Sequence, residues 1–348
     1  MNRYQFRLLN GCLWLMGLIF LAALSFIRIS IPEVKSLDTW VDGRFARNVE
    51  LQYNDNFMLK EWFINIWAAL NYSFLGEGQT GVIVGKDGWL FTQEEFQWNN
   101  SSKINLDSSI AEIVKTYNYL RSKGLLVELI LIPPKAEIYS DKLIPSSIYS
   151  HHNLHTLVTA ELIKNGVAVK DLSPVLKDAR KVADSFMRTD THWTPLGAEY
   201  VAKAISKHMN RNNSLGNYIT QVKSKITYRG DLLNYIPVFP NLTKFGPNAD
   251  NLELMVTTAV ESSNSDDLLS ETDPIEQVLI GTSYSANDNW NFSGALKQYT
   301  GQDLINFSEE GKGPFLPMRN WLQRKGEDQL GLKVVFWEIP VRYLIQSK

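Results

Sequence analysis

Cysteine is nearly absent from this 348-residue sequence, which contains it only at position 12. One cysteine cannot form an intrachain disulfide, and we interpret Cys12, which lies inside an apolar run, as a membrane-facing side chain. A basic surplus is also missing, because 35 lysines and arginines are balanced by 37 aspartates and glutamates to give a formal net charge of −2. The composition therefore argues against a nucleic-acid-binding protein.

Histidine is scarce as well, and three of the five histidines lie together in HHNLH, at His151, His152 and His155. His151 and His155 have the i, i+4 spacing of metal ligands on a helix, but no glutamate of the HExxH kind accompanies them. We expect solvated capping residues at this helix start instead. A phosphate-binding glycine loop is also missing, since GKDGW lacks the required strand-to-helix context. The sequence thus predicts no metal and no cofactor.

One long hydrophobic run is present, from Leu8 to Ile27, with Arg3 and Arg7 before it and Arg28 after it. As a helix, these twenty uncharged residues span about 30 Å, the thickness of bilayer hydrocarbon. The run fits a cleaved signal peptide or a retained signal anchor, and its length favours retention. We therefore expect 1–29 to be a single-pass inner-membrane anchor. Its basic flank favours a cytoplasmic N-terminus and a periplasmic body.

The remaining chain divides into a short connecting segment and one large domain. We expect 30–75 to be a partly helical juxtamembrane segment and 76–348 to be the globular domain, which opens with a hairpin at Asp87-Gly88. The region at about 218–273 is rich in loop-forming and acidic residues. We interpret it as an insertion of loops and a few strands.

Helix and strand patterns alternate through the large domain. Asp107 can cap a helix that stops at Gly124, and Thr194-Pro195 has the signature of another helix start. The apolar runs LLVELILIPP, VLIG and LKVVFWEIP are typical of strands buried on both faces of a sheet, and GVAVKDL predicts one more strand. The alternation predicts an α/β domain with a mainly parallel sheet.

Side chains suited to nucleophilic catalysis occur in two of these stretches. Ser283, in VLIGTSYS, follows a predicted buried strand, where a tight turn would expose the hydroxyl and leave backbone N–H groups free for an oxyanion. Asp190 and His192, in RTDTHW, can supply the base and the acid that orients it. Ser285 is an alternative nucleophile, but the turn geometry favours Ser283.

Several motifs occur together in a characteristic order, namely DGWLF, IPPKAEIY, DTHWTPLGA, GTSYS, EGKGP and WEIP followed by RY. With them, the chain from Val82 to its end resembles the alginate O-acetyltransferase family of the AlgJ/AlgX type. That resemblance implies a three-layer, SGNH-hydrolase-like fold. It also implies a triad in permuted chain order, with Asp190 and His192 before Ser283.

Further residues are candidates for contacts with the substrate. The resemblance implies that Lys312 and Tyr343 border the substrate. Trp193 is an aromatic candidate for stacking on a sugar, beside the ordinary role of aromatics in the core. Lys135 follows a strand end and could contact an anionic sugar or be simply solvated.

The function implied by the resemblance is O-acetylation of an exopolysaccharide, alginate or similar, through an acetyl-serine intermediate. The acetyl group would come from a membrane-bound O-acyltransferase partner, because acetyl-CoA is absent outside the cytoplasm. An acetylesterase of the same fold is one alternative. A non-catalytic, membrane-tethered subunit for polysaccharide assembly is another.

Overall fold

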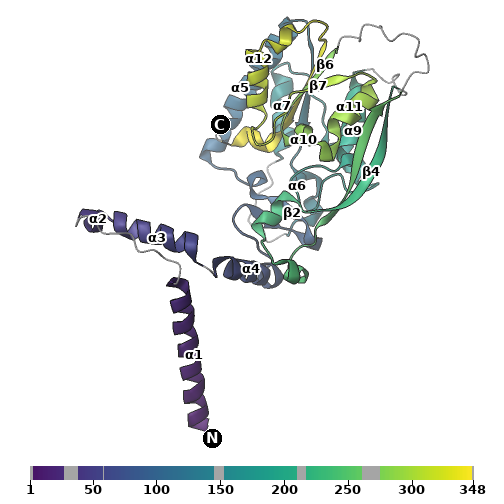
Figure 1. Cartoon of the computed structure of the whole chain (residues 1–348). Coiled ribbons are helices and arrows are strands. Elements are labelled where there is room, and N and C mark those ends of the chain that lie inside the picture. The colour runs from purple at the N-terminus through teal and green to yellow at the C-terminus, as the bar shows by residue number, and fades with distance from the viewer. Residues whose placement is uncertain are drawn as a thin grey trace, which may run out of the picture. The chain divides into compact units, whose positions relative to one another are not determined.

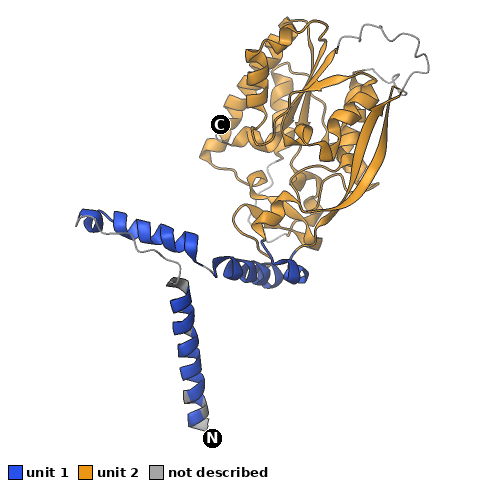
Figure 2. Ribbon diagram, in the orientation of Figure 1, with its two compact units in different colours: residues 1–75, 237–246 blue, residues 76–236, 247–348 orange. Residues whose placement is uncertain are grey.

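The computed structural model describes residues 3–26, 38–57, 59–144, 153–209, 217–260 and 275–346. The chain forms two compact units (Figure 2), one comprising 1–75 with 237–246 and the other comprising 76–236 with 247–348. The larger unit contains every residue that the sequence analysis singles out for catalysis.

The smaller unit is helical. Its helices are α1 (Arg3–Phe26), α2 (Asp38–Val41), α3 (Arg44–Asn56) and α4 (Lys60–Leu70), which continues into a π-helical turn, Asn71–Leu75. The expected anchor lies largely within α1. Within the described ranges, however, no helix combines the length and the apolar character needed to cross a bilayer. The membrane-spanning helix predicted from the sequence is therefore not shown by the structure.

The larger unit is built around a parallel sheet, which has four strands within its described residues. Their order across the sheet is β3 (Leu126–Ile132), β8 (Val334–Pro340), β6 (Gln277–Ile280) and β7 (Leu304–Asn306). Every neighbouring pair is parallel, so all four carboxyl ends lie at the same edge. The apolar runs LLVELILIPP, VLIG and LKVVFWEIP correspond to β3, β6 and β8, which confirms the predicted parallel α/β architecture.

Side chains alternate between the two faces of the sheet and form two separate cores. On β8, Val335, Trp337 and Ile339 belong to one core, whereas Phe336 belongs to the other. Helices cover both faces, which gives the expected three layers (Figure 1). One core is covered by α5 (Asn100–Ser122), α7 (Leu154–Lys164) and α12 (Phe315–Gln323), and the other by α8 (Ser173–Arg180), α9 (Pro195–His208) and α11 (Phe292–Thr300).

Two antiparallel hairpins accompany the parallel sheet. β1 (Val82–Val84) and β2 (Leu90–Thr92) form the predicted first hairpin around Asp87 and Gly88, both of which have positive φ. The expected insertion contains a longer hairpin of β4 (Tyr218–Tyr228) and β5 (Asp250–Ala259), which packs against α9 and α11 (Figure 1). It is more regular than the loop-rich sequence indicates.

Two sequence predictions are wrong in detail. The helix expected from Asp107 begins at Asn100, because the Asn99 side chain accepts hydrogen bonds from the N–H groups of Ser101 and Ser102. The strand expected at GVAVKDL is reduced to one parallel bridge between Val169 and Leu129. The helix begins earlier than predicted because Asn99 is a stronger cap than Asp107. The segment GVAVKDL pairs with β3 at one residue only and does not continue as a strand.

Candidate functional site

The carboxyl ends of the strands place the candidate residues at one edge of the parallel sheet. Three residues after β6 ends at Ile280 comes Ser283, and three residues after β3 ends at Ile132 comes Lys135. Arg342 and Tyr343 follow β8 in the same way. Ligands and reactive groups collect at this edge in open α/β sheets.

The turn after β6 presents the serine hydroxyl. Gly281 and Thr282 lead from the strand into the short helix α10 (Ser283–Ala286), and the Thr282 side chain caps that helix by accepting a bond from the N–H of Tyr284. Thr282 and Tyr284 are almost fully buried, whereas Ser283 between them is partly exposed. The turn therefore holds its neighbours in the core and offers Ser283 to the surface.

The loop that contains Asp190 and His192 is closed at its base. Phe186 and Trp193 form an antiparallel bridge, and the N–H of Met187 donates to the carbonyl of His192 at 2.9 Å. Downstream, the Thr194 hydroxyl caps α9 by accepting a bond from the N–H of Gly197, as the Thr-Pro signature predicts. Because hydrogen bonds fix both ends of this loop, its side chains have little conformational freedom.

Hydrogen bonds connect Asp190, His192 and Ser283 in series. Nδ1 of His192 lies 2.6 Å from Oδ1 of Asp190, and Nε2 of His192 lies 2.7 Å from Oγ of Ser283. Because an ionised carboxylate only accepts hydrogen bonds, Nδ1 carries the proton and Nε2 is free to accept from the serine hydroxyl. This is the geometry of a nucleophile with its general base and orienting acid.

The Asp190 carboxylate is held in its ionised form. Burial would raise the pKa of Asp190, but the hydrogen bonds and charge of His192 and the N–H of Asp231 lower it to about 2. Oδ1 also accepts from the N–H of His192, and Oδ2 accepts from Asp231 N–H at 2.9 Å and from the Tyr228 hydroxyl at 3.1 Å. Four donors thus surround a carboxylate that is only 1% exposed.

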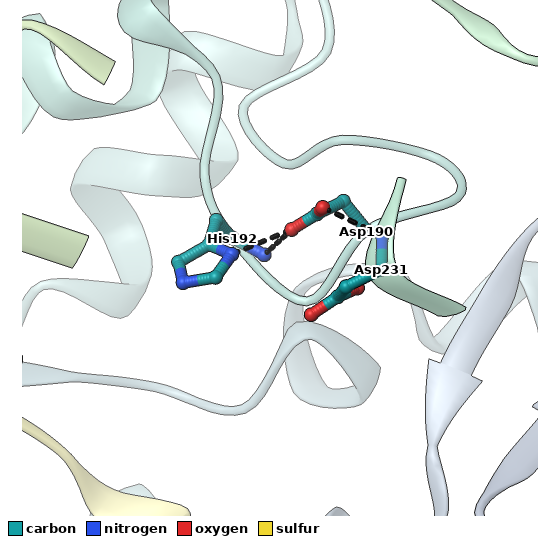
Figure 3. A group of neighbouring side chains, drawn as sticks. All are labelled: Asp190, His192 and Asp231. Carbon is teal, nitrogen blue, oxygen red and sulfur yellow. Dashed lines mark hydrogen bonds and ion pairs between the residues drawn. The ribbon is translucent and has the colours of Figure 1, made fainter. Parts of the chain in front are cut away.

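A second acid, Asp231, lies beside Asp190 and His192 (Figure 3). Ligand atoms of Asp190, His192 and Asp231 lie within 4.8 Å of one another, a spacing that could hold a metal ion. Each carboxylate oxygen of this group, however, already accepts a protein donor: both oxygens of Asp231 bind Thr191, through its N–H and its hydroxyl. We therefore interpret Asp190 and His192 as a hydrogen-bonded pair and Asp231 as an acid that supports the same loop.

Aromatic rings fix the plane of the His192 imidazole. The Trp290 ring stacks on it with a centroid distance of 5.2 Å and an interplanar angle of 19°. The ring of Tyr284 lies against it at 4.6 Å, and Tyr228 packs edge-on against Trp290. The apolar packing restricts rotation of the imidazole and leaves its two nitrogens for Asp190 and Ser283.

Tyr284 ties the serine turn to the Asp190–His192 loop. Its hydroxyl donates to the carbonyl of Thr191 at 2.5 Å and accepts from Arg342 at 2.8 Å. Its own carbonyl accepts a bond from the indole N–H of Trp193. Tyr284, the residue after Ser283, is thereby bonded to the residues on both sides of His192. Two segments that are far apart in sequence are held as one site.

His192 and Ser283 border a cleft of about 310 Å³, within the range of small-ligand sites. Its lining includes Ser283, His192, Arg342, Tyr343 and Gly311. Tyr343 is thus placed at the cleft, as the family resemblance implies. The exposed side chain of Lys312 follows Gly311 but does not belong to the lining.

Two expected substrate contacts are corrected by the structure. Trp193 is fully buried, packs on Phe292 and donates its indole N–H to Tyr284, so it cannot stack on a sugar. Lys135 is only 1% exposed, and its ammonium group donates to the carbonyls of Arg188 and Asp190. Burial lowers the pKa of Lys135 to about 8. Lys135 thus binds the backbone of the loop that contains Asp190, and Trp193 bonds this loop to the serine turn.

The other weighed candidates also have structural explanations. His155 is buried, not solvated as expected, and its ring nitrogens lie within hydrogen-bonding distance of the Ser173 hydroxyl and the Leu131 carbonyl. His151 and His152 lie outside the described residues. Ser285, the alternative nucleophile, is buried and donates its hydroxyl to Glu338.

Three residues of the site were not predicted from the sequence, namely Asp231, Tyr228 and Glu338. Asp231 and Tyr228 lie in the segment interpreted as an insertion, where no local pattern links them to the triad. Glu338 had a signal, because it is an acid inside the apolar run of β8. Burial raises the pKa of Glu338 to about 7, against hydrogen bonds from Thr282 and Ser285 that lower it. A buried charge in a strand of apolar residues needs partners, and here the partners flank Ser283.

Comparison with known proteins places the site in a family context. The family described as SGNH hydrolase-like domain, acetyltransferase AlgX, matches residues 82–341. The chain is 35% identical to the probable alginate O-acetylase AlgJ of Pseudomonas syringae pv. tomato, over 97% of this chain and 88% of that protein. It is 36% identical to the probable alginate O-acetylase AlgJ of Pseudomonas aeruginosa, over 87% of this chain and 81% of that protein.

Solved structures support the same fold. The O-acetyltransferase domain of Pseudomonas putida AlgJ superposes with a TM-score of 0.67 at 34% identity, covering 77% of this chain and 93% of that one. Pseudomonas aeruginosa AlgX superposes with a TM-score of 0.56 at 18% identity, covering 76% of this chain and 63% of that one. The second likeness is one of fold alone.

Proposed function

Because the chain belongs to the family of SGNH hydrolase-like acetyltransferase domains of the AlgX type, we propose that it is an O-acetyltransferase acting on alginate or a similar exopolysaccharide. The observation that carries this proposal is the series of hydrogen bonds from Asp190 through His192 to Ser283, at 2.6 and 2.7 Å. It supplies an activated nucleophile in the lining of a cleft.

In the first step, the acetyl group is transferred to the enzyme. His192 Nε2 takes the proton of the Ser283 hydroxyl as Oγ attacks the acetyl carbonyl, and the Ser283 N–H donates to the oxyanion that forms. The bond to the donor's oxygen then breaks, and His192 returns the proton to that leaving group. Asp190 stabilises the imidazolium throughout without taking the proton itself. Acetyl-Ser283 remains.

In the second step, a sugar hydroxyl accepts the acetyl group. His192, again neutral, removes the proton of that hydroxyl as its oxygen attacks the acetyl-serine carbonyl. The second tetrahedral intermediate breaks to the acetylated sugar and free Ser283, to which His192 returns the proton. Tyr343, which lines the cleft, and Lys312, which is exposed beside it, are the residues we assign to contacts with the polysaccharide.

The acceptor distinguishes this activity from that of an acetylesterase with the same triad. With a chromogenic acetyl ester as donor, we expect the purified full chain to form acetylated oligosaccharide from an alginate oligomer, with acetate from water as the minor product. Mass spectrometry of the sugar products and an acetate assay measure the partition. Acetate alone, at saturating acceptor, would identify an esterase. A chain that consumes no ester would favour the non-catalytic assembly role.

We further propose that the catalytic domain is periplasmic and held at the inner membrane through Leu8–Ile27. This rests on the twenty uncharged residues of that run and on the flanking Arg3, Arg7 and Arg28. A membrane-bound O-acyltransferase would supply the acetyl group there. In a Gram-negative cell, we expect the full chain in the inner-membrane fraction, with its domain degraded by protease added to spheroplasts. A soluble or protease-protected domain would contradict this.

A further inference from the structure

A buried carboxylate lies behind the nucleophile and contacts the turn on both sides of it. Glu338, on β8, is fully buried, and its Oε2 accepts the N–H of Thr282 at 2.7 Å and the hydroxyl of Ser285 at 3.0 Å. The Thr282 hydroxyl lies 3.1 Å from both carboxylate oxygens. Thr282 precedes Ser283 by one residue and Ser285 follows it by two, so one side chain spans the nucleophile.

Three residues of the turn after β6, Gly281, Thr282 and Ser285, are suited to the neighbouring Glu338 carboxylate. A Cβ atom at Gly281 would collide with the Glu338 side chain, so glycine is required where the strand passes it. Thr282 and Ser285 provide the hydroxyl donors that a buried carboxylate needs. Parallel pairing of β6 with β8, in which Ile280 lies opposite Trp337, fixes where Glu338 meets the turn. The motifs GTSYS and WEIP thus form one structural unit.

We propose that Glu338 is a positioning residue for the acyl-transfer reaction: its carboxylate fixes the backbone of the turn so that the Ser283 hydroxyl meets Nε2 of His192. This rests on the proposed function. The N–H of Thr282 is bound to Glu338, which sets the orientation of the peptide group before Ser283. A displacement of about 1 Å at a nucleophile can reduce a rate about 100-fold. Glu338 accepts its hydrogen bonds from Thr282 and Ser285 and does not belong to the cleft lining, although its charge interacts with that of His192.

Two variants separate the acceptor role from general packing. Glu338→Leu keeps the approximate volume and removes every acceptor, and we expect kcat for the chromogenic ester to fall about 100-fold with KM within about twofold of wild type. Glu338→Gln keeps one acceptor oxygen and should retain kcat within about tenfold. Glu128→Leu is the matched control, since Glu128 is a buried acid on the adjacent strand β3, where it binds His208.

The position of Ser283 can be read without turnover. The rate at which a sulfonyl fluoride labels Ser283, followed by mass spectrometry of the full chain, should fall in parallel with kcat in Glu338→Leu and stay near wild type in Glu128→Leu. Should Glu338→Leu fail to fold, the double variant Thr282→Val with Ser285→Ala removes the hydroxyl donors, and we expect a fall of about tenfold in kcat and in labelling.

Two results would overturn the inference. One is a folded Glu338→Leu protein with wild-type kcat and labelling rate. The other is an equal loss in Glu338→Leu and Glu338→Gln, since the amide keeps an acceptor oxygen. The inference can fail separately from the proposed function: if the wild-type chain turns over no acetyl ester, the function is wrong, while the labelling rates still report how Ser283 is positioned.

Discussion

Replacing Ser283 with alanine is expected to reduce kcat for an acetyl ester by about 10⁴-fold or more, because the variant lacks the hydroxyl that we propose carries the acetyl intermediate. The loss should appear in kcat, with KM little changed, since the cleft keeps its shape. Steady-state assay of the purified full chain measures both constants. Intact mass spectrometry should detect a trapped acetyl adduct of +42 Da, about one acetyl group, on the wild type and none on Ser283→Ala.

Ser285→Ala provides the matched control two residues away. Ser285 is buried and donates its hydroxyl to Glu338, so this variant loses one of several bonds that hold the turn. We expect kcat to fall by no more than about tenfold and the acetyl adduct to persist. If instead Ser285→Ala lost the adduct and Ser283→Ala kept it, the assignment of the nucleophile would be reversed.

The fold was largely predictable because its strands are buried on both faces. Such strands have continuous apolar sequences, and LLVELILIPP, VLIG and LKVVFWEIP all became strands of the parallel sheet. The boundaries were less predictable where caps compete, as at Asn99, or where pairing depends on a distant strand, as at Val169. Local pattern indicates burial, but pairing partners and cap strength are set in three dimensions.

The candidate site was predictable only where its residues are close in sequence or belong to a distinctive motif. Asp190 and His192 share one loop, and Ser283 belongs to a turn that follows a buried strand. Asp231 and Tyr228 bind Asp190 from a region that folds back after about forty residues, so no spacing rule finds them. The role of Trp193 was predicted wrongly because an aromatic residue beside His192 can either stack on a sugar or pack in the core. Only the burial of its side chain distinguishes the two roles.

The supporting residues explain why the chain can keep a charged aspartate in its interior. Two backbone N–H groups and the Tyr228 hydroxyl share the charge of Asp190 with the imidazole. The buried ammonium group of Lys135 also donates hydrogen bonds to carbonyls of the same loop. A buried carboxylate without such donors would take up a proton and could no longer orient a histidine.

Asp190→Asn tests this electrostatic arrangement, and we expect it to lower kcat by about 10⁴-fold while leaving the fold intact. An amide in place of the carboxylate can favour the wrong tautomer of His192 and cannot stabilise the imidazolium. Asp231→Asn is the matched control: Asp231 bonds Thr191 and not the imidazole, so we expect a loss of about tenfold or less. Equal losses in the two variants would contradict the assignment of Asp190 as the orienting acid.

A comparison of wild type with Asp190→Asn also tests how the stability of the fold depends on pH. The pKa of Asp190 is lowered from 3.8 to about 2 in the folded chain, so ionisation stabilises the fold above about pH 4. That contribution, about 2 kcal/mol, is lost as the pH falls from about 4 to about 2. The free energy of unfolding, measured with denaturant, should therefore fall over this range by about 2 kcal/mol more for wild type than for Asp190→Asn, which has no such group to protonate. Parallel pH dependence in both proteins would mean that Asp190 is not held ionised by the donors around it, and the orienting role would lose its electrostatic basis.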